Sequence, residues 1–360
     1  IPMRAFARAP VRVDPAGGGT DAPPFCVDHG GKVVNFGVRR HVFARAQRLG
    51  PGEEILIYSE DLGAGIQARG AAGLPAAGRL ELLQGFVRKL LPPGESVLLV
   101  TGSEVPPGSG LGGSGALGVS VVAALDRLFG VSRSKDDTAA VANEVERQDL
   151  GYPGGSQDSY AAARGGLNLL EYHQGGGMTP RGIEVTEEMI RELEESSLLV
   201  FTGAAHVSGS IHDDIRRSYH EAGSKTLEAM FELRSEAGRM TRALEAGDLE
   251  GYARALGGSC RGLYNLHESC DSAEHRAVFE KLDRLILGGK TCGAGGGGFL
   301  LLCAKPGLRE ECAVRVGELG AASWPFEFDF DGVSASEEPA WSEEELEGYR
   351  RLIAGDSSQG

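Results

Sequence analysis

The chain of 360 residues is long enough for two domains or one large one, and it can bury a core without disulfide bonds or a structural metal. A formal net charge of −15 argues against nucleic acid or a membrane surface as a partner, because both need a basic footprint. No apolar run approaches the roughly 18 residues of a membrane span, no signal-peptide core opens the chain, and the six cysteines lack metal-site spacing. We therefore expect a cytoplasmic protein with free thiols.

The N-terminal half predicts antiparallel strands followed by helices. Runs of β-branched and aromatic residues predict strands over 11–14, 32–38, 41–47 and 54–59, and the Gly/Ala-rich stretch 62–78 predicts a loop. An amphipathic period over 79–91 predicts a helix. The remaining elements of this half are a buried strand (96–102), a loop (105–115), an apolar helix ending at Gly130, and a helix over 134–150 capped by Ser134.

The C-terminal half predicts a second α+β layer. A composition shift at 173–182 places a domain boundary, giving domains over 1–177 and 178–335 and an acidic, solvated tail over 336–360. Helix, strand, helix and strand in succession fit a ferredoxin-like arrangement. The predicted elements are strand 197–203, helices 208–246, 248–266 and 273–287, loop 288–298, strand 299–304, helix 308–319 and strand 323–330.

The most informative segment lies between the buried strand and the apolar helix. Its four glycines, Gly108, Gly110, Gly112 and Gly113, let backbone N–H groups approach an anion without an intervening Cβ. The helix that begins near Ser114 adds free N–H groups and the positive end of its dipole. The hydroxyls of this segment can donate to phosphate or bind the accompanying Mg²⁺. The sequence predicts a phosphate-binding loop.

Other glycine-loop folds fit this segment less well. The spacing matches G-x-G-x-x-G, but no second parallel strand ending in an acid follows, as a dinucleotide fold requires. No Lys-Ser/Thr pair completes a Walker loop, and no G-x-S-x-G elbow indicates a serine hydrolase. The alternative interpretation of this segment is a glycine-rich turn that binds no ligand.

A second glycine cluster, KTCGAGGGGFLLL over 290–302, leads into a strand. A backbone with so few side chains predicts a close approach, either by a ligand or by the first loop. A tight turn at a domain contact is the alternative.

Two pairs of polar residues are candidates for chemistry. Arg12 and Asp21 flank a three-glycine turn, where a carboxylate suits a sugar hydroxyl and an arginine suits phosphate; a surface ion pair is the alternative. Glu146 and Asp158 come from separate elements, so one could bind a metal while the other takes a hydroxyl proton in phosphoryl transfer. Acids on a helix surface, with Asp158 as an N-cap, are the alternative.

Four segments in this order resemble the GHMP kinases, small-molecule kinases that include galactokinase, homoserine kinase and mevalonate kinase. They are RAPVRVDPAGGGTD (8–21), PPGSGLGGSGAL (106–117), Glu146 with GGSQD (154–158), and KTCGAGGGGFLLL (290–302). AGGGTD and GGSQDSYAAARGGLN are most similar to D-glycero-D-manno-heptose phosphate kinases and next to L-fucokinases. The resemblance implies an α+β, two-lobed fold with an N-terminal S5-like domain, a C-terminal ferredoxin-like domain, and ATP and Mg²⁺ in the cleft between them.

The resemblance also implies roles for individual residues. Asp158 corresponds to the catalytic carboxylate, Arg12 to the arginine that steadies it and the transferred phosphate, and Ser114 and Glu146 to the magnesium ligands. The residues that correspond to the ATP site are Pro107, Gly108, Ser109, Gly110, Leu111, Gly112, Gly113, Ser114, Gly295 and Gly296. Those that correspond to the acceptor site are Gly18, Gly19, Thr20, Asp21 and Gly155, with Asp21 at a sugar-hydroxyl contact.

The sequence departs from the family pattern at two places. Where the family reads GLGSSA or GLGSSS, Gly113 removes a hydroxyl and Gly115 loosens the helix start. Heptose-type kinases commonly carry an arginine at the position of His206. Histidine is mostly neutral at pH 7 and therefore binds phosphate less strongly than arginine does. This weakens the case for a phosphorylated acceptor, although 39–41 (Arg-Arg-His) offers another anion site.

The expected activity is ATP-dependent transfer to a sugar hydroxyl, anomeric in a heptose phosphate or related sugar. A free neutral sugar such as L-fucose is the alternative acceptor, and a non-catalytic ligand-binding member is an alternative of another class. A mevalonate-like alcohol is disfavoured by the GGGTD loop. The expected partner is a small sugar or sugar phosphate, with oligomeric state left open.

Overall fold

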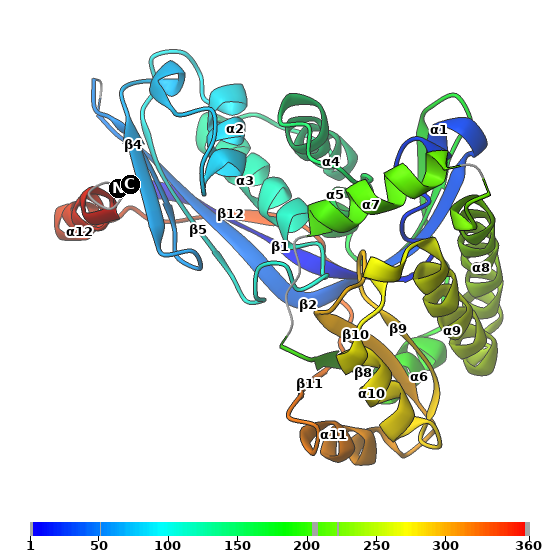
Figure 1. The fold of residues 1–360 in the computed structure, drawn as a ribbon. Helices are drawn as coiled ribbons and strands as arrows, with labels where there is room; N and C mark the ends of the chain where they lie inside the picture. Colours follow the sequence, from blue (N-terminus) through cyan, green and yellow to red (C-terminus); the bar gives the residue numbers. More distant parts are fainter. Residues whose placement is uncertain (1–2, 51, 204–207, 222, 357–360) are drawn as a thin grey trace.

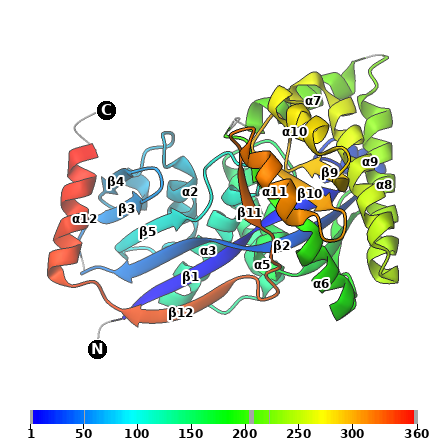
Figure 2. The same ribbon diagram turned by 90° about the horizontal axis from the view of Figure 1, so that it is seen from below.

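The computed structural model describes residues 3–50, 52–203, 208–221 and 223–356, which form two sheets covered by helices (Figures 1 and 2). The first sheet has the strand order β12-β1-β2-β5-β3-β4, with β6 beside β2 and β7 beside β6. Its strands are β1 (Met3–Ala16), β2 (Gly31–Arg48), β3 (Ile55–Ser59), β4 (Ala64–Ala68), β5 (Val97–Ser103), β6 (Leu167–Tyr172), β7 (Met178–Gly182) and β12 (Ser334–Pro339).

Strand β1 lies between β12 and β2, and its inner face is buried because it is made of small and branched residues. Ala5, Ala7, Ala9, Val11 and Val13 alternate along it and are each at most 2% exposed. Helix α3 packs against β1 and β2 on this face. The helices of the lobe are α1 (Phe25–His29), α2 (Glu81–Leu90), α3 (Gly113–Phe129), α4 (Lys135–Asn143), α5 (Gln157–Arg164) and α12 (Glu343–Asp356).

The second sheet is antiparallel and has the order β11-β8-β10-β9, which is the 4-1-3-2 order of a ferredoxin-like fold. Its strands are β8 (Ser197–Phe201), β9 (Ile286–Thr291), β10 (Phe299–Ala304) and β11 (Ala322–Pro325). Its helices are α6 (Glu187–Ser196), α7 (Ser208–His220), α8 (Thr226–Ala246), α9 (Leu249–Leu266), α10 (Ala273–Leu282) and α11 (Arg309–Gly317). Helices α8 and α9 lie side by side as an antiparallel pair in both views.

Several predicted boundaries differ from the structure. The predicted strands 32–38 and 41–47 are one strand, β2, because β1 pairs with both halves while the other neighbour changes from β6 to β5. The predicted loop 62–78 contains β4, which pairs with β3. The predicted helix 273–287 ends nearer the middle of that range, since 286–287 already pair as β9. The predicted helix 134–150 changes at residue 144 into a wide π-type turn (Glu144–Asp149).

The acidic segment after residue 335 does not lie in solvent as a tail. Over its described part, 336–356, it contributes to β12, which pairs with β1, and forms α12, which packs on β3 and β4. Trp341, Leu346 and Ile353 bury their side chains there, although four glutamates and two arginines lie between Trp341 and Ile353 in the sequence. A few well-spaced apolar residues therefore outweigh the acidic composition and close the first sheet at its edge.

Among the described residues, no helix is both long enough and apolar enough to cross a lipid bilayer.

Candidate active site

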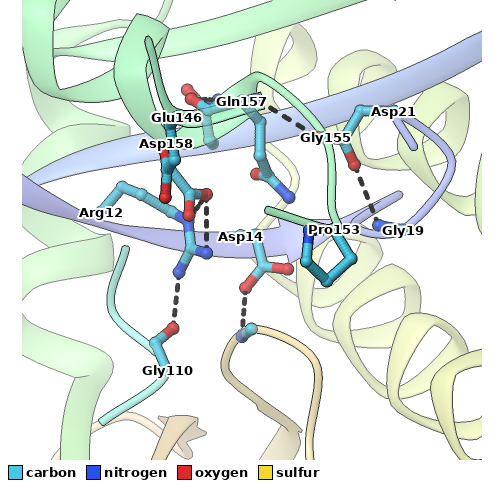
Figure 3. A network of polar contacts seen from close by, with 12 residues as sticks. Arg12, Asp14, Gly19, Asp21, Gly110, Glu146, Pro153, Gly155, Gln157 and Asp158 are labelled. Atoms are coloured by element: carbon cyan, nitrogen blue, oxygen red, sulfur yellow. Dashed lines mark hydrogen bonds and ion pairs between the residues drawn. The ribbon is translucent and has the colours of Figure 1, made fainter. Parts of the chain in front are cut away.

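The centre of the site is an ion pair between β1 and α5 (Figure 3). The Arg12 guanidinium donates from Nε and Nη2 to Asp158 Oδ1, at 2.8 and 2.7 Å. Its Nη1 donates to the Gly110 carbonyl at 2.5 Å. Burial disfavours the charge of Arg12, but the carboxylates of Asp158 and Asp14 outweigh it, and the pKa of Arg12 is raised. Arg12 thus joins the carboxylate on α5 to the glycine loop before α3.

That glycine loop adopts a conformation that other residues would strain. Gly108, Gly110 and Gly112 all have φ between 70° and 83°. A Cβ on Gly112 would also lie 3.0 Å from Arg12 Cγ. Helix α3 begins directly afterwards, so its free N–H groups point toward the loop.

The remaining residues of the loop divide into two kinds. Pro107 and Ser114 are exposed, whereas Leu111 is buried and its carbonyl accepts from the Arg12 backbone N–H at 2.9 Å. Ser109 is 2% exposed, and its Oγ has no hydrogen-bond partner among the described residues. Because a buried hydroxyl without a partner is costly, this Oγ suits a ligand's polar atom.

The second glycine cluster forms the hairpin between β9 and β10, and it lies directly against the first loop. A Cβ on Gly110 would be 2.6 Å from the Cys292 carbonyl oxygen, and one on Gly298 would be 2.4 Å from that of Ser109. The Phe299 N–H donates to the Ser109 carbonyl at 3.0 Å. The close approach predicted for this cluster is therefore made by the first loop. Gly295 and Gly296 in turn pack on the Cys270 carbonyl.

Asp21 does not pair with Arg12, so the alternative of a surface ion pair is wrong. Its Oδ1 and Oδ2 accept the N–H groups of Gly19 and Gln157, both at 3.2 Å. A Cβ on Gly155 would lie 1.8 Å from Oδ2, so only glycine fits there. Burial, together with the charge of Asp158, raises the pKa of Asp21 to about 6.

Thr20 and Gly18, which are also predicted to contact the acceptor, make contacts within the protein that stabilise this turn. The Thr20 hydroxyl lies within hydrogen-bond distance of the Gly17 and Lys32 carbonyls, at 2.8 and 2.9 Å. A Cβ on Gly18 would be 2.0 Å from Asp14 Oδ2. Beside the turn is a pocket of about 250 Å³, which Gly19 lines together with Arg147, Tyr152, His212, Arg216 and Tyr219.

Glu146 lies in the wide turn after α4 and is 3% exposed. Burial raises its pKa, while a hydrogen bond with Ser114 and the neighbouring Arg147 oppose the shift. No group of three or more His, Cys, Asp or Glu side chains placed to hold a metal ion occurs in the described parts of the chain. A kinase needs to supply only one or two carboxylate ligands to Mg²⁺, because substrate phosphates and water complete its coordination shell. Glu146 and Ser114 therefore fit a magnesium ion.

Two functional candidates escaped the sequence analysis. Lys290 Nζ lies 3.3 Å from Asp14 Oδ2, and both side chains are at most 2% exposed. Asp14 Oδ1 accepts the Gly293 N–H at 2.8 Å. This buried pair connects β1 to the second glycine cluster across the two lobes. A signal was present: a charge two residues after Arg12, on the same face of the strand, and a lysine in a segment otherwise free of charge.

A third missed residue is Arg147, which shapes the turn before α5. Its guanidinium donates to the carbonyls of Pro153 and Gly155, at 2.6 and 3.0 Å. Gly155 lies against Asp21, so Arg147 fixes the position of the backbone that packs on the acceptor turn.

At the second anion site predicted for 39–41, two of the three side chains already lie against carboxylates. Arg39 lies 3.8 Å from a Glu327 oxygen, and His41 Nε2 lies 2.8 Å from Asp329 Oδ2. Positive groups already paired with carboxylates offer little to a phosphate. His206 lies outside the described residues.

The two glycines that depart from the family pattern differ in their surroundings, which gives a matched test. A Cβ on Gly115 would lie 2.6 Å from Asp158 Cβ, whereas one on Gly113 would meet nothing within 4 Å. We expect Gly115→Ala to displace Asp158 and lower kcat by about 10- to 100-fold. Gly113→Ala, in the same helical turn, should keep kcat within about twofold. Steady-state kinetics check both, and equal effects would contradict the packing argument.

Comparison with known proteins agrees with this arrangement. Residues 80–166 match the family described as GHMP kinases N terminal domain. The chain is 30% identical over 312 residues to a D-glycero-alpha-D-manno-heptose 7-phosphate kinase of Campylobacter jejuni, covering 83% of this chain and 89% of that protein. It is 26% identical over 338 residues to an L-fucokinase/L-fucose-1-P guanylyltransferase of Bacteroides fragilis. That alignment covers 86% of this chain but 35% of the longer protein.

Solved structures give the same result for the fold. A D-glycero-D-manno-heptose 1-phosphate kinase from Bacteroides thetaiotaomicron superposes with a TM-score of 0.76 at 27% identity, covering 94% of this chain and 100% of that one. A Lactococcus lactis galactokinase complexed with galactose superposes with a TM-score of 0.73 at 16% identity, covering 92% and 95%. The second likeness concerns the fold alone.

Proposed function

This chain belongs to the GHMP kinase family, and we propose that it is an ATP-dependent sugar kinase whose acceptor is a heptose phosphate or a closely related sugar. One observation carries the proposal. The Arg12 guanidinium contacts both the Asp158 carboxylate and the Gly110 carbonyl of the glycine loop. A carboxylate is thereby fixed beside a loop suited to nucleotide phosphates, which is the geometry that phosphoryl transfer requires.

In this proposal, Asp158 accepts the proton of the acceptor hydroxyl while the hydroxyl oxygen attacks the γ-phosphorus of ATP. The bond between the γ-phosphorus and the bridging oxygen breaks, and ADP leaves with that electron pair. Arg12 holds the carboxylate in place and offers positive charge to the phosphoryl group in transit. The transfer therefore needs no covalent enzyme intermediate.

The glycine loop and the start of α3 would hold the triphosphate. Residues 107–114 offer backbone N–H groups, and the second cluster would line the same region because Gly293 and Gly298 pack on the first loop. Gly295 and Gly296 lie between these two glycines in the same hairpin. Glu146 and Ser114 would hold Mg²⁺, which supplies charge neutralisation for the phosphates. A phosphate oxygen would give the buried Ser109 hydroxyl the hydrogen-bond partner that it lacks among the described residues.

The acceptor would bind in the pocket beside Asp21. Asp21 would accept a hydrogen bond from a sugar hydroxyl, and Arg147 and Arg216 line this pocket of about 250 Å³. Arg216 lies 2.8 Å from Asp213 and Arg147 lies 3.6 Å from Glu146, so a phosphate on the sugar would compete with these carboxylates for the two arginines. Likeness to the Campylobacter heptose 7-phosphate kinase supports the same acceptor class. Likeness to the fucokinases favours the second candidate, a free sugar such as L-fucose.

An ATP-consumption screen over free sugars and sugar phosphates, with NMR of each product, tests the proposal. We expect ADP formation with a heptose phosphate and a new phosphoryl group on the anomeric oxygen. Turnover of L-fucose alone would select the second candidate. If the protein binds ATP but does not consume it with any of the sugars, it would be a ligand-binding family member without catalytic activity.

The pKa of Asp21, raised to about 6, predicts a pH dependence of acceptor binding. The sugar hydroxyl needs the ionised carboxylate, so kcat/KM for the acceptor should fall toward tenfold per pH unit below about pH 6. Kinetics between pH 5 and 8 measure this, and Asp21→Asn should lack that component. Identical profiles for the two proteins would contradict it.

The same shift has a consequence of opposite sign for stability. A carboxyl whose pKa is raised by folding holds its proton in the folded state where the unfolded chain has lost it. The contribution of Asp21 to the free energy of unfolding therefore decreases as pH rises from about 4 to about 6. Acceptor binding and stability thus depend on this residue in opposite directions.

A further inference from the structure

The outer side of the α8–α9 pair carries a concentration of arginine that the rest of this acidic chain does not predict. A hollow of about 710 Å³ lies between the two helices and the start of β9. Arg239 and Arg242 reach it from α8, and Arg254 and Arg261 from α9. A second hollow of about 350 Å³ shares Arg239 and Arg242 and adds Lys32 and Arg234. The two hollows together form one basic surface.

The charges in the larger hollow do not balance. Its four arginines face two carboxylates, Glu236 and Asp248. Glu236 is engaged by Arg239, and Asp248 lies 3.5 Å from Arg254. Arg242 and Arg261 are exposed, and neither forms an ion pair with a carboxylate within the described ranges. Two guanidinium groups in one concavity therefore have their donors available for an anion.

Each of these two arginines lies over a glycine one turn earlier in its own helix. Arg242 Nη1 lies 3.6 Å from the position of a Cβ on Gly238, and Arg261 Nη1 lies 3.6 Å from that of a Cβ on Gly257. Each arginine thus extends along its helix over the turn before it, at van der Waals distance from where a Cβ of that turn would lie. The small residues leave room between the helices for a ligand.

We propose that this hollow binds a small molecule bearing a diphosphate group, with Arg242 and Arg261 as its principal contacts. Two unbalanced guanidinium groups match the two phosphoryl groups, and each can donate two hydrogen bonds to one of them. A small anion responds mainly to this local charge. An extended polyanion would also meet the field of a chain with net charge −15, which disfavours a nucleic acid or an acidic protein surface here.

The position of the hollow connects it to both halves of the active site. On the inner side of α8, Ala237 Cβ lies 2.9 Å from the position of a Cβ on Gly17, in the acceptor turn. On α9, the carbonyl of Ala253, a residue that itself lines the hollow, packs on Gly288, two residues before Lys290. A ligand that ties α8 to α9 would therefore also restrain the hairpin that follows β9.

Titration with inorganic pyrophosphate tests the site. AMPPNP and Mg²⁺ are added first to saturation, so that the glycine loops are filled, and isothermal calorimetry then follows pyrophosphate binding. We expect binding to the unaltered chain and at least about tenfold weaker binding to Arg242→Gln/Arg261→Gln. Arg191→Gln/Arg351→Gln, which removes two exposed arginines elsewhere that also lack a carboxylate partner within the described residues, should bind as the unaltered chain does.

A second readout reports the connection to the site. Pyrophosphate should slow hydrogen exchange of backbone amides over 290–298 in the AMPPNP-bound protein, but not in Arg242→Gln/Arg261→Gln. No pyrophosphate binding, or equal weakening in both double variants, would overturn the proposal, and binding without slower exchange would overturn the connection. If AMPPNP fails to bind, the kinase proposal fails, while pyrophosphate titration of the same variants still decides the hollow.

Discussion

Asp158→Asn should lower kcat by about 10³-fold while the affinity for ATP stays within about threefold, because a positioned carboxylate that accepts a proton contributes on the order of 10²–10⁴. The asparagine keeps an oxygen for the Arg12 guanidinium, which donates to Asp158 Oδ1 at 2.8 Å. It therefore removes the base and the negative charge with little change of shape. Steady-state kinetics and calorimetric binding of AMPPNP measure the two quantities separately.

Asp158→Ala is expected to abolish transfer as well, but it also leaves the buried Arg12 without the carboxylate to which it donates its hydrogen bonds, and breaking a buried pair costs about 3–5 kcal/mol. The asparagine variant is thus the sharper test. Asp136→Asn is its control, since Asp136 is a partly exposed helix residue paired with Arg164 outside the site. Unchanged turnover in Asp158→Asn would remove Asp158 from the catalytic role.

Local patterns in the sequence predict the glycine loops well because each loop is specified by neighbouring residues. Gly108, Gly110 and Gly112 follow a buried strand and precede an apolar helix, and all three adopt the positive φ that only glycine takes without strain. The N-cap at Ser134, whose side chain accepts the Asp137 N–H, is equally local. Such features depend on a few adjacent residues and are readable from them.

Contacts between distant segments could not be predicted in the same way. Two contacts depend on how the lobes pack: the contact between Gly110 and Cys292 and the ion pair between Asp14 and Lys290. The sequence allowed either a ligand or the first loop to approach the second glycine cluster, and only the packing selects the loop. For the same reason the acidic C-terminal segment was expected in solvent: its partner strand, β1, is more than 300 residues earlier.

Lys290→Met should lower the free energy of unfolding by about 3–5 kcal/mol, because it leaves the buried Asp14 carboxylate without its ion-pair partner. Methionine approximates the length of the lysine stem, so the lost term is mainly the charge and not the volume. Chemical denaturation measures the change. Lys281→Met, which removes a partly exposed lysine that lies 2.8 Å from Glu318, should cost less than about 1 kcal/mol.

The double variant Lys290→Met/Asp14→Asn separates charge from packing. A neutral asparagine can still accept the Gly293 N–H through its side-chain oxygen, so the double variant should recover much of the stability that Lys290→Met loses. Because Gly293 packs on Gly110, the ATP KM should follow the same order, highest in Lys290→Met and closer to normal in the double variant. A loss of stability in the double variant equal to the sum of the losses in Lys290→Met and Asp14→Asn would contradict this expectation. That result would mean that the pair makes no net interaction and that the hairpin is held by its glycine contacts alone.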